Sequence, residues 1–298
     1  MAILKVSVPA TSANLGPGFD CVGLALDLVN TLYFSMEKSS ITDLPHGAVQ
    51  LSAGSLAHQG FNLVAEKTGK KMPPHLFVAI GAQVPRSRGL GSSATLTVAG
   101  IVAANVLLQA DLSQEEIITL ATRIEGHPDN AAPAYLGGLV VSITSQDGIK
   151  YLKVEPPSML RVIVAVPDFE LATSAARKVL PTQVSRQDAV FNAGHFGLFM
   201  TAILTGHFQM LGLAMEDRLH QPYRTPLVPG LQEVMATAQA QGALGSCLSG
   251  AGPSVLAFCN RADEEIGEAM KNTWRRAGIK AEIFRLNISC EGTKYTFI

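Results

Sequence analysis

The chain has 298 residues, of which 47% are apolar and 16% are charged, with 23 basic and 24 acidic side chains. At roughly 150 residues per domain, this length predicts about two domains. The apolar fraction excludes a disordered chain, and the balanced charge excludes a nucleic-acid binder held by bulk positive charge.

Four cysteines lie far apart in the sequence, and none belongs to a Cys-x-x-Cys pair. This spacing argues against a zinc cluster or a redox dithiol and is typical of a reducing compartment. The first residues lack the apolar core of a signal peptide. We therefore expect a cytoplasmic protein.

Periodicity and capping signals divide the N-terminal half into short elements. They predict a strand over Lys5–Pro9, a loop of small residues over Ala10–Phe19, and a second strand over His75–Ile80. Gly89-Leu-Gly-Ser-Ser opens an apolar helix over Ala94–Leu108. A capping box, Ser113-Gln-Glu-Glu116, begins the next helix, which is expected to end near Gly126-His127-Pro128.

Composition shifts at Glu155-Pro-Pro-Ser158, which predicts a boundary between a domain of residues 1–157 and one of residues 158–298. Strands are expected over Leu160–Val166, Ser254–Cys259 and Ile279–Ile288, with an amphipathic helix over Ala262–Ala277 capped by Gly278. This pattern predicts an α+β sandwich of helices on a sheet.

Two long stretches carry no charged side chain, Gly89–Ala110 and Ala189–Met215. Serine, asparagine, glutamine and histidine interrupt both. Helices that are apolar all round also occur in a large core or at a subunit interface, so we interpret the stretches in that way rather than as membrane spans.

The strongest chemical signal is Val84-Pro-Arg-Ser-Arg-Gly-Leu-Gly-Ser-Ser-Ala-Thr95. The first turn of a helix has free amides and a partial positive charge, so it can hold a phosphate. Gly89 and Gly91 allow close backbone approach. Ser92 and Ser93 can cap the helix or bind a phosphate-linked Mg²⁺. The alternative is an ordinary glycine turn with serine caps.

Three other phosphate-binding patterns were compared with this segment. Gly69-Lys70 is followed by lysine, so no Walker A loop is present, and the protein-kinase triplets HRD and DFG are absent. A dinucleotide-binding pattern formally matches Gly89–Ala94, with Asp111 at about the right distance. Val84–Arg88 separates these glycines from any strand, and Asp111 directly follows a helix, which weakens this interpretation.

Other segments offer candidate ligands, each with a structural alternative. Asn14 and Asp20 lie in a loop of small residues, where short polar side chains bind ligands or cap turns. Glu125-Gly-His-Pro-Asp-Asn130 is a plausible site or a solvated helix end. Gly245–Ser254 is a second glycine-rich turn. Arg177 and Arg224 suit a carboxylate, although lone arginines more often form surface ion pairs.

Taken together, these segments resemble the GHMP kinase superfamily, and within it the branch that phosphorylates homoserine. Three motifs occur in family order: Pro9–Asp20, Pro85–Ala94 and Gly245–Ser254. His-Pro-Asp-Asn at 127–130 adds to the match, which spans nearly the whole chain. Ser87 and Thr95 depart from the family pattern, where glycine and alanine are common.

The resemblance implies a two-domain α+β fold, with an N-terminal ribosomal-protein-S5 domain-2-like domain and a C-terminal ferredoxin-like α/β sandwich. It implies ATP-dependent phosphorylation of the side-chain hydroxyl of L-homoserine for threonine synthesis, with Mg²⁺, in a homodimer. No nucleic-acid or membrane partner is expected.

The resemblance also implies roles for particular residues. ATP would be bound by Asn62, at the adenine, and by the phosphate loop, Pro85, Arg86, Ser87, Arg88, Gly89, Leu90, Gly91, Ser92, Ser93 and Ala94. Ser93 and Glu125 would hold Mg²⁺. Homoserine would be bound by Asn14, Asp20, His127, Arg177 and Arg224, and Asn130 would lie near its hydroxyl.

The residues themselves agree with a zwitterionic acceptor, since Asp20 can bind an ammonium group and the two arginines a carboxylate. Phosphoryl transfer needs alignment and charge neutralisation more than a strong base. We therefore favour Asn130 and Mg²⁺ as positioning groups, with Asp129 as general base the alternative. Another GHMP small-molecule kinase, a nucleotide-binding oxidoreductase and a non-catalytic nucleotide-binding module remain the competing functions.

Overall fold

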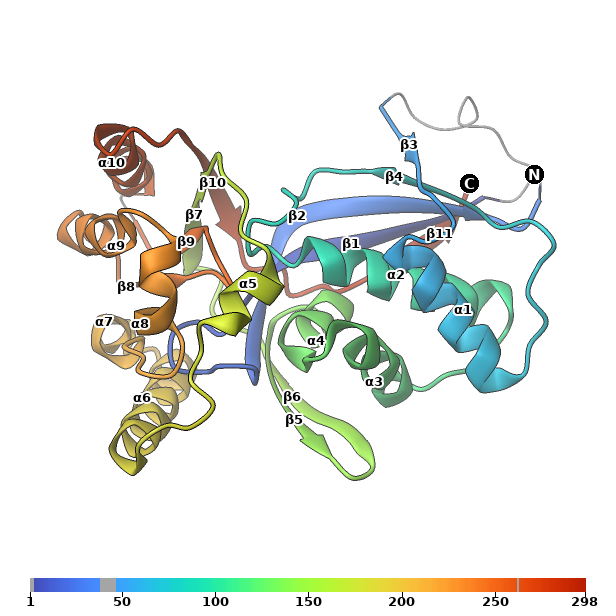
Figure 1. Ribbon diagram of the computed structural model, residues 1–298, viewed down its shortest axis with the longest axis horizontal. Coiled ribbons are helices and arrows are strands. Elements are labelled where there is room, and N and C mark those ends of the chain that lie inside the picture. Colours follow the sequence, from blue (N-terminus) through green and yellow to red (C-terminus); the bar gives the residue numbers. More distant parts are fainter. Residues whose placement is uncertain (1–2, 38–46, 262) are drawn as a thin grey trace.

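The computed structural model describes residues 3–37, 47–261 and 263–298. These residues form two antiparallel sheets with helices packed on them (Figure 1). The strands of the larger sheet are β1 Leu4–Ala13, β2 Val22–Ser35, β3 Val49–Gln50, β4 Phe77–Gly81, β5 Leu139–Ser145, β6 Gly148–Val154 and β11 Lys294–Phe297. Its helices are α1 Leu56–Thr68, α2 Ser92–Leu107, α3 Gln114–Glu125 and α4 Pro128–Leu136.

The second sheet has the order β10-β7-β9-β8. Its strands are β7 Arg161–Pro167, β8 Gly245–Leu248, β9 Val255–Cys259 and β10 Ala281–Asn287. The α-helices of this half are α5 Thr173–Lys178, α6 Arg186–Thr205, α7 Leu211–Ala214, α8 Gln221–Arg224, α9 Leu231–Ala240 and α10 Asp263–Arg276. Two 3₁₀ turns, η2 Phe208–Met210 and η3 Thr225–Leu227, complete it. If these four strands are numbered 1 to 4 along the chain, their spatial order across the sheet is 4-1-3-2, which is the expected ferredoxin-like arrangement.

Helices α1 to α4 cover one face of the larger sheet (Figure 1). Alternate residues of β1, Leu4, Val6 and Val8, face this helix layer and are fully buried. The uncharged helix α2 lies between α1, α3 and β1, and ten of its residues are buried. The interpretation of Gly89–Ala110 as a core segment is therefore confirmed. Among the helices described, none is long and apolar enough to cross a membrane.

Strand β7 joins the two halves of the core. Its even-numbered residues, Val162, Val164 and Val166, pack with α6 and the base of β2, whereas Ile163 and Ala165 pack with α9 and α10. The predicted boundary lies between β6 and β7. Strand β11 nevertheless returns to pair with β1, so the last residues of the chain belong to the first sheet. The division at residue 157 stays a prediction.

The predicted elements correspond to β1, β4, α2, α3, β7, β9, α10 and β10. The capping box of α3 is present, with the Glu116 amide donating to Ser113 Oγ and the Ser113 amide to Glu116 Oε2. Ala262, the first residue of one predicted helix, lies outside the described residues.

Two boundaries were wrong. The expected loop over Ala10–Phe19 begins only at Asn14, because Ala10–Ala13 continue β1 and pair with Gly23–Leu26 of β2. The segment Gly245–Ser254, predicted as a turn throughout, begins with strand β8.

Candidate active site

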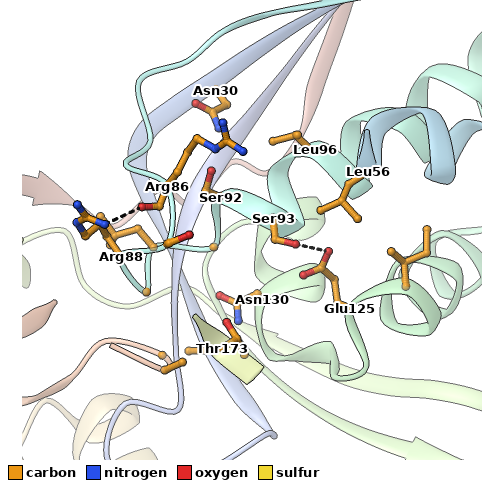
Figure 2. Close-up of a pocket in the computed structure, with 18 of the residues that line it drawn as sticks. Asn30, Leu56, Arg86, Arg88, Ser92, Ser93, Leu96, Glu125, Asn130 and Thr173 are labelled. Atoms are coloured by element: carbon orange, nitrogen blue, oxygen red, sulfur yellow. Dashed lines mark hydrogen bonds between the residues drawn. The ribbon is translucent and has the colours of Figure 1, made fainter. Parts of the chain in front are cut away.

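A cavity of about 960 Å³ lies where the two sheets meet, and the predicted site segments gather around it (Figure 2). Strand β2 changes partner here, from β4 at Thr31–Ser35 to β5 at Val22–Leu24. Beside this change, Asn30 Oδ1 accepts hydrogen bonds from the amides of Gln83 and Val84. The chain leaving β4 is thereby fixed before it enters the phosphate loop.

The phosphate loop ends at Gly91, which caps α2 in the left-handed conformation and offers no side chain. In the described part of the chain, no hydrogen bond reaches the backbone amides of Ser92 and Ser93. Both residues line the cavity. The start of α2 thus presents free donors and a positive helix end toward the cavity, as a phosphate site requires.

Glycine is required in this loop for close packing against protein. A Cβ on Gly89 would lie 2.1 Å from the Ser249 carbonyl oxygen, and one on Gly91 would lie 1.9 Å from Thr11 Oγ1. Both residues also have positive φ angles, 73° and 65°. A larger residue at position 89 would push the loop away from the C-terminal glycine turn (residues 249–253), and one at position 91 would push it away from β1.

The predicted ATP-binding residues fall into two groups. Those from Arg86 to Ser93 line the cavity, whereas Pro85 lines a separate groove and Ala94 is fully buried. The Arg88 guanidinium donates to the carbonyls of Pro167, Asp168 and Arg86, and lies 3.5 Å from Glu170. Its side chain therefore fastens the loop to the end of β7.

Asn62 lies on the exposed side of α1 and is not among the residues lining the cavity. The structure does not bring it to the site. Apolar side chains near the start of α1 and on α2 and α3 line the cavity instead, namely Leu51, Leu56, Leu96 and Ile124. A planar apolar ring would find its contacts there.

Glu125 and Ser93 are brought together as expected. Glu125 Oε1 accepts a hydrogen bond from Ser93 Oγ at 2.9 Å (Figure 2) and a second one from Thr97 Oγ1 at 2.6 Å. Ser93 and Thr97 lie one turn apart on α2, so two hydroxyls hold one carboxylate oxygen. Sequence reasoning missed Thr97, whose hydroxyl is buried in an otherwise apolar helix.

The segment His127–Asn130 forms a short hydrogen-bonded chain. Thr11 Oγ1 donates to Asn130 Oδ1 at 2.8 Å, and Asn130 Nδ2 donates to Asp129 Oδ1 at 3.2 Å. His127 Nδ1 also contacts Asp129 Oδ1. Burial acts to lower the pKa of His127, but the hydrogen bond and charge of Asp129 outweigh it, so the net pKa is raised. Thr11 orients the Asn130 amide.

Asp20 and Arg177 face each other across the cavity mouth. Arg177 Nη1 and Nη2 donate to the two carboxylate oxygens of Asp20 at 3.0 and 2.5 Å, and this hydrogen bond raises the pKa of Arg177. Ligand atoms of Asp20, His127 and Asp129 lie within 4.8 Å of one another. Two carboxylates close together make this side of the cavity suitable for a cationic group.

Arg224 supplies the opposite charge, and it is almost fully buried, with 1% of its surface exposed. Burial and the charge of Arg177 lower its pKa to about 10, which leaves the guanidinium charged at neutral pH. Its described hydrogen bonds go to the carbonyls of Ala176 and Gly250 and to His220. A buried cation without a carboxylate on it is suited to an anionic ligand.

Asn14 lines the cavity, but its amide is engaged within the protein. Its Nδ2 donates to the Gly250 carbonyl, and its Oδ1 accepts from the Asp20 amide. Asn14, Leu15 and Asp20 all have positive φ angles. The side chain of Asn14 thus holds a strained turn that aims Asp20 at the cavity.

The dinucleotide-binding interpretation of Gly89–Ala94 is wrong. That motif needs a parallel βαβ unit, with its acidic residue at the end of a second strand. The sheet beside α2 pairs antiparallel, and Asp111 lies in the turn between α2 and α3.

Comparisons with known proteins agree with this geometry. The sequence matches the family described as GHMP kinases N terminal domain over residues 55–138, and GHMP kinases C terminal over residues 199–277. The fold and the site therefore define a GHMP kinase, an ATP-dependent small-molecule kinase.

Full-length relatives narrow the class. The homoserine kinase of Gloeobacter violaceus is 46% identical over 280 residues, covering 91% of this chain and 93% of its own. That of Microchaete diplosiphon is 42% identical over 295 residues, covering 97% and 96%. A crystal structure of homoserine kinase from Cytophaga hutchinsonii superposes with a TM-score of 0.84 at 29% identity, covering 99% and 97%. The chain belongs to the homoserine kinase family.

Proposed function

We propose that the protein transfers the γ-phosphoryl group of ATP to the side-chain hydroxyl of L-homoserine, giving ADP and O-phospho-L-homoserine on the route to threonine. The single observation that supports a zwitterionic acceptor is the buried guanidinium of Arg224 in the same cavity as the carboxylates of Asp20 and Asp129. A zwitterion has an ammonium group for these carboxylates and a carboxylate group for the guanidinium. Sugar acceptors have no charge for either.

The Asp20 carboxylate and the Arg177 guanidinium form an ion pair in this structure. Homoserine replaces this pair by offering its ammonium group to Asp20 and its carboxylate to Arg177 and Arg224. The free amides at the start of α2 bind the ATP phosphates, and the apolar side chains around Leu56 and Leu96 receive the adenine.

The hydroxyl oxygen of homoserine then bonds to the γ-phosphorus, its proton passes to an oxygen of the transferred phosphoryl group, and the bond from that phosphorus to the ADP oxygen breaks. Asn130, held by Thr11, positions the hydroxyl. Proton abstraction by Asp129 is the alternative, although Asp129 Oδ1 already contacts both His127 and Asn130. If Asp129 is the base, Asp129→Asn lowers kcat by at least about 100-fold. A smaller loss supports positioning.

Hydroxyl and carboxylate oxygens are the ligands that Mg²⁺ prefers, and Ser93 Oγ lies 2.9 Å from Glu125 Oε1 beside the free amides of α2. These residues fit the metal, and we propose that they hold it. Bound there, Mg²⁺ neutralises phosphate charge. Thr97 keeps the Glu125 carboxylate in place.

The homodimer and the cytoplasmic location also stay proposals. Helix α6 supports the first, because its outer face exposes Val190 and Leu204 at 66% and 63% and the stretch from Ala189 to Met215 has no charge. A two-fold interface brings a surface against itself, so an uncharged face avoids like-charge contact. If the wild type sediments as a dimer, the Leu204→Glu variant should sediment as a monomer. Four free cysteines support a reducing compartment.

The test of function is ADP release on incubation with ATP, Mg²⁺ and L-homoserine. We expect ADP only when homoserine is present, together with O-phospho-L-homoserine detected by ³¹P NMR. Binding of ATP without turnover would instead show a nucleotide-binding module. Phosphorylation of galactose or mevalonate in preference to homoserine would refute the choice of acceptor.

A further inference from the structure

Arg224 has five N–H donors, and its neighbours use three of them. Nε donates to the Ala176 carbonyl at 3.1 Å, and Nη1 contacts the Gly250 carbonyl at 3.1 Å and His220 Nδ1 at 3.2 Å. Among the described residues, Nη2 has no hydrogen-bond partner, and Arg224 lines the cavity. The protein therefore holds Nε and Nη1 of the guanidinium and leaves the two hydrogens of Nη2 for a ligand.

His220 is the side chain that holds Nη1. It is fully buried, and its Nε2 lies 2.8 Å from the Gly16 carbonyl oxygen. Because arginine only donates, His220 Nδ1 must accept from Arg224, and Nε2 must then carry the proton that it donates to Gly16. Burial lowers the pKa of His220, which agrees with this neutral form. Both ring nitrogens thus form hydrogen bonds, Nδ1 with Arg224 and Nε2 with the turn that ends at Asp20.

A buried scaffold holds the His220 ring in this position. Asp217 accepts hydrogen bonds from the amides of Leu219, His220 and Gln221, and also from Asn192 Nδ2. Asn192 Nδ2 also donates to the Pro17 carbonyl, within the same turn as Gly16. The Phe19 ring stacks on His220 at 5.3 Å, and the guanidinium carbon of Arg224 lies 5.4 Å from the centre of that ring. His220 therefore connects Arg224 to the strained turn that ends at Asp20.

We propose that His220 is a positioning residue, which aims Arg224 Nη2 at the acceptor and so gives the enzyme its preference for a carboxylate. This inference rests on the proposed function and deepens it. Without an acceptor atom at His220 Nδ1, Arg224 keeps only its bonds to the Ala176 and Gly250 carbonyls, and the guanidinium can tilt so that Nη2 no longer points at the carboxylate. The amine end of the acceptor, which Asp20 binds, depends less on His220.

Two isosteric variants separate the two hydrogen bonds of His220. His220→Gln places an amide nitrogen near Nε2 and keeps a donor for Gly16, but it has no acceptor for Arg224. His220→Asn places an amide oxygen near Nδ1 and keeps the acceptor, but it loses the donor. His207→Gln is the matched control, since the His207 side chain is exposed and hydrogen-bonds only to Thr205 among the described residues.

Three ligands separate the two ends of the acceptor. They are L-homoserine, 4-hydroxybutanoate, which lacks the ammonium group, and 3-aminopropan-1-ol, which lacks the carboxylate. The KM of homoserine and the inhibition constants of the other two are measured against homoserine phosphorylation at saturating ATP. Binding of AMP-PNP and thermal unfolding show that each variant is folded.

In His220→Gln, we expect the KM of homoserine and the inhibition constant of 4-hydroxybutanoate to rise by about tenfold or more. The inhibition constant of 3-aminopropan-1-ol should rise by less than about twofold. His220→Asn should keep the carboxylate preference, and His207→Gln should match the wild type. Equal weakening of all three ligands in His220→Gln would show a merely structural role and overturn the proposal, as would an unchanged KM. A wild type that does not phosphorylate homoserine at all would instead overturn the proposed function.

Discussion

Replacing Arg224 by leucine tests the acceptor site most directly. The two hydrogens on Arg224 Nη2 are available to a carboxylate. A hydrogen bond to a charged group contributes about 1.5–3 kcal/mol, and about 1.4 kcal/mol is a factor of ten in affinity. One such bond already predicts a rise of at least about tenfold in the homoserine KM, and two would give more. The KM for ATP should change little.

The same substitution also costs stability. Leucine leaves the Ala176 carbonyl and His220 Nδ1 without their partner, whereas the Gly250 carbonyl keeps its bond from Asn14. A buried unpaired group costs about 1–3 kcal/mol. Kinetics must therefore be measured well below the melting temperature, with folded enzyme counted by AMP-PNP titration. Arg224→Lys, which keeps the charge but loses the fork, should lie between wild type and leucine. An unchanged homoserine KM in Arg224→Leu would remove this residue from the site.

Three further substitutions probe other parts of the cavity. Glu125→Gln should slow turnover and raise the Mg²⁺ concentration needed for half-maximal rate, whereas the exposed control Glu115→Gln should not; wild-type magnesium dependence in the first would exclude the metal role. Ser87 has a φ of 53°. Ser87→Gly should relieve about 1–2 kcal/mol of backbone strain, whereas the greater entropy of the unfolded chain should cost about 0.4–1 kcal/mol. The free energy of unfolding in urea should therefore be equal or higher. A decrease of more than about 1 kcal/mol would contradict the strain at Ser87. Because the pKa of His127 is raised in the folded state, its pairing with Asp129 stabilises the fold fully below the unfolded pKa near 6.5 and is lost as the pH rises through the folded pKa. The stability lost in His127→Gln should therefore be larger at pH 6 than at pH 9, and a difference that does not change with pH would refute the pairing.

Local signals in the sequence were sufficient for the phosphate loop and for most elements around it. The turn at Gly89–Ser93 and the capping box at Ser113 depend on neighbouring residues, and both form as predicted. The loop at Ala10–Phe19 was misjudged because small residues such as Ala10 and Ala13 suit a turn when read alone. In the fold they pair with β2 as part of a strand, and the Thr11 amide between them donates to the Leu90 carbonyl of the phosphate loop.

Residues that act through another side chain were beyond sequence reasoning. Thr11 is 119 positions from Asn130, and only the fold brings the Thr11 hydroxyl to the Asn130 amide. His220 carried a weak signal, since its spacing from Arg224 places the two on one helical face. Arg88 stays a predicted ATP-binding residue, but the sequence could not show that its guanidinium donates to three carbonyl oxygens.

The glycine turn at residues 249–253 connects the proposed site for the ATP phosphates with the proposed acceptor site. Ser249 Oγ donates to the Gly89 carbonyl in the phosphate loop and contacts Ser12 Oγ in β1. The next residue, Gly250, accepts from both Asn14 and Arg224 through its carbonyl. One tight turn of the second sheet therefore fixes the loop for the ATP phosphates and both ends of the acceptor pocket. Because β11 also returns to the first sheet, the two halves of the chain cannot separate without dismantling the cavity. Four non-glycine residues near this turn have positive φ angles, namely Asn14, Leu15, Asp20 and Ser87. Such backbone strain persists where the surrounding structure holds the chain in place, as the contacts of the glycine turn do here.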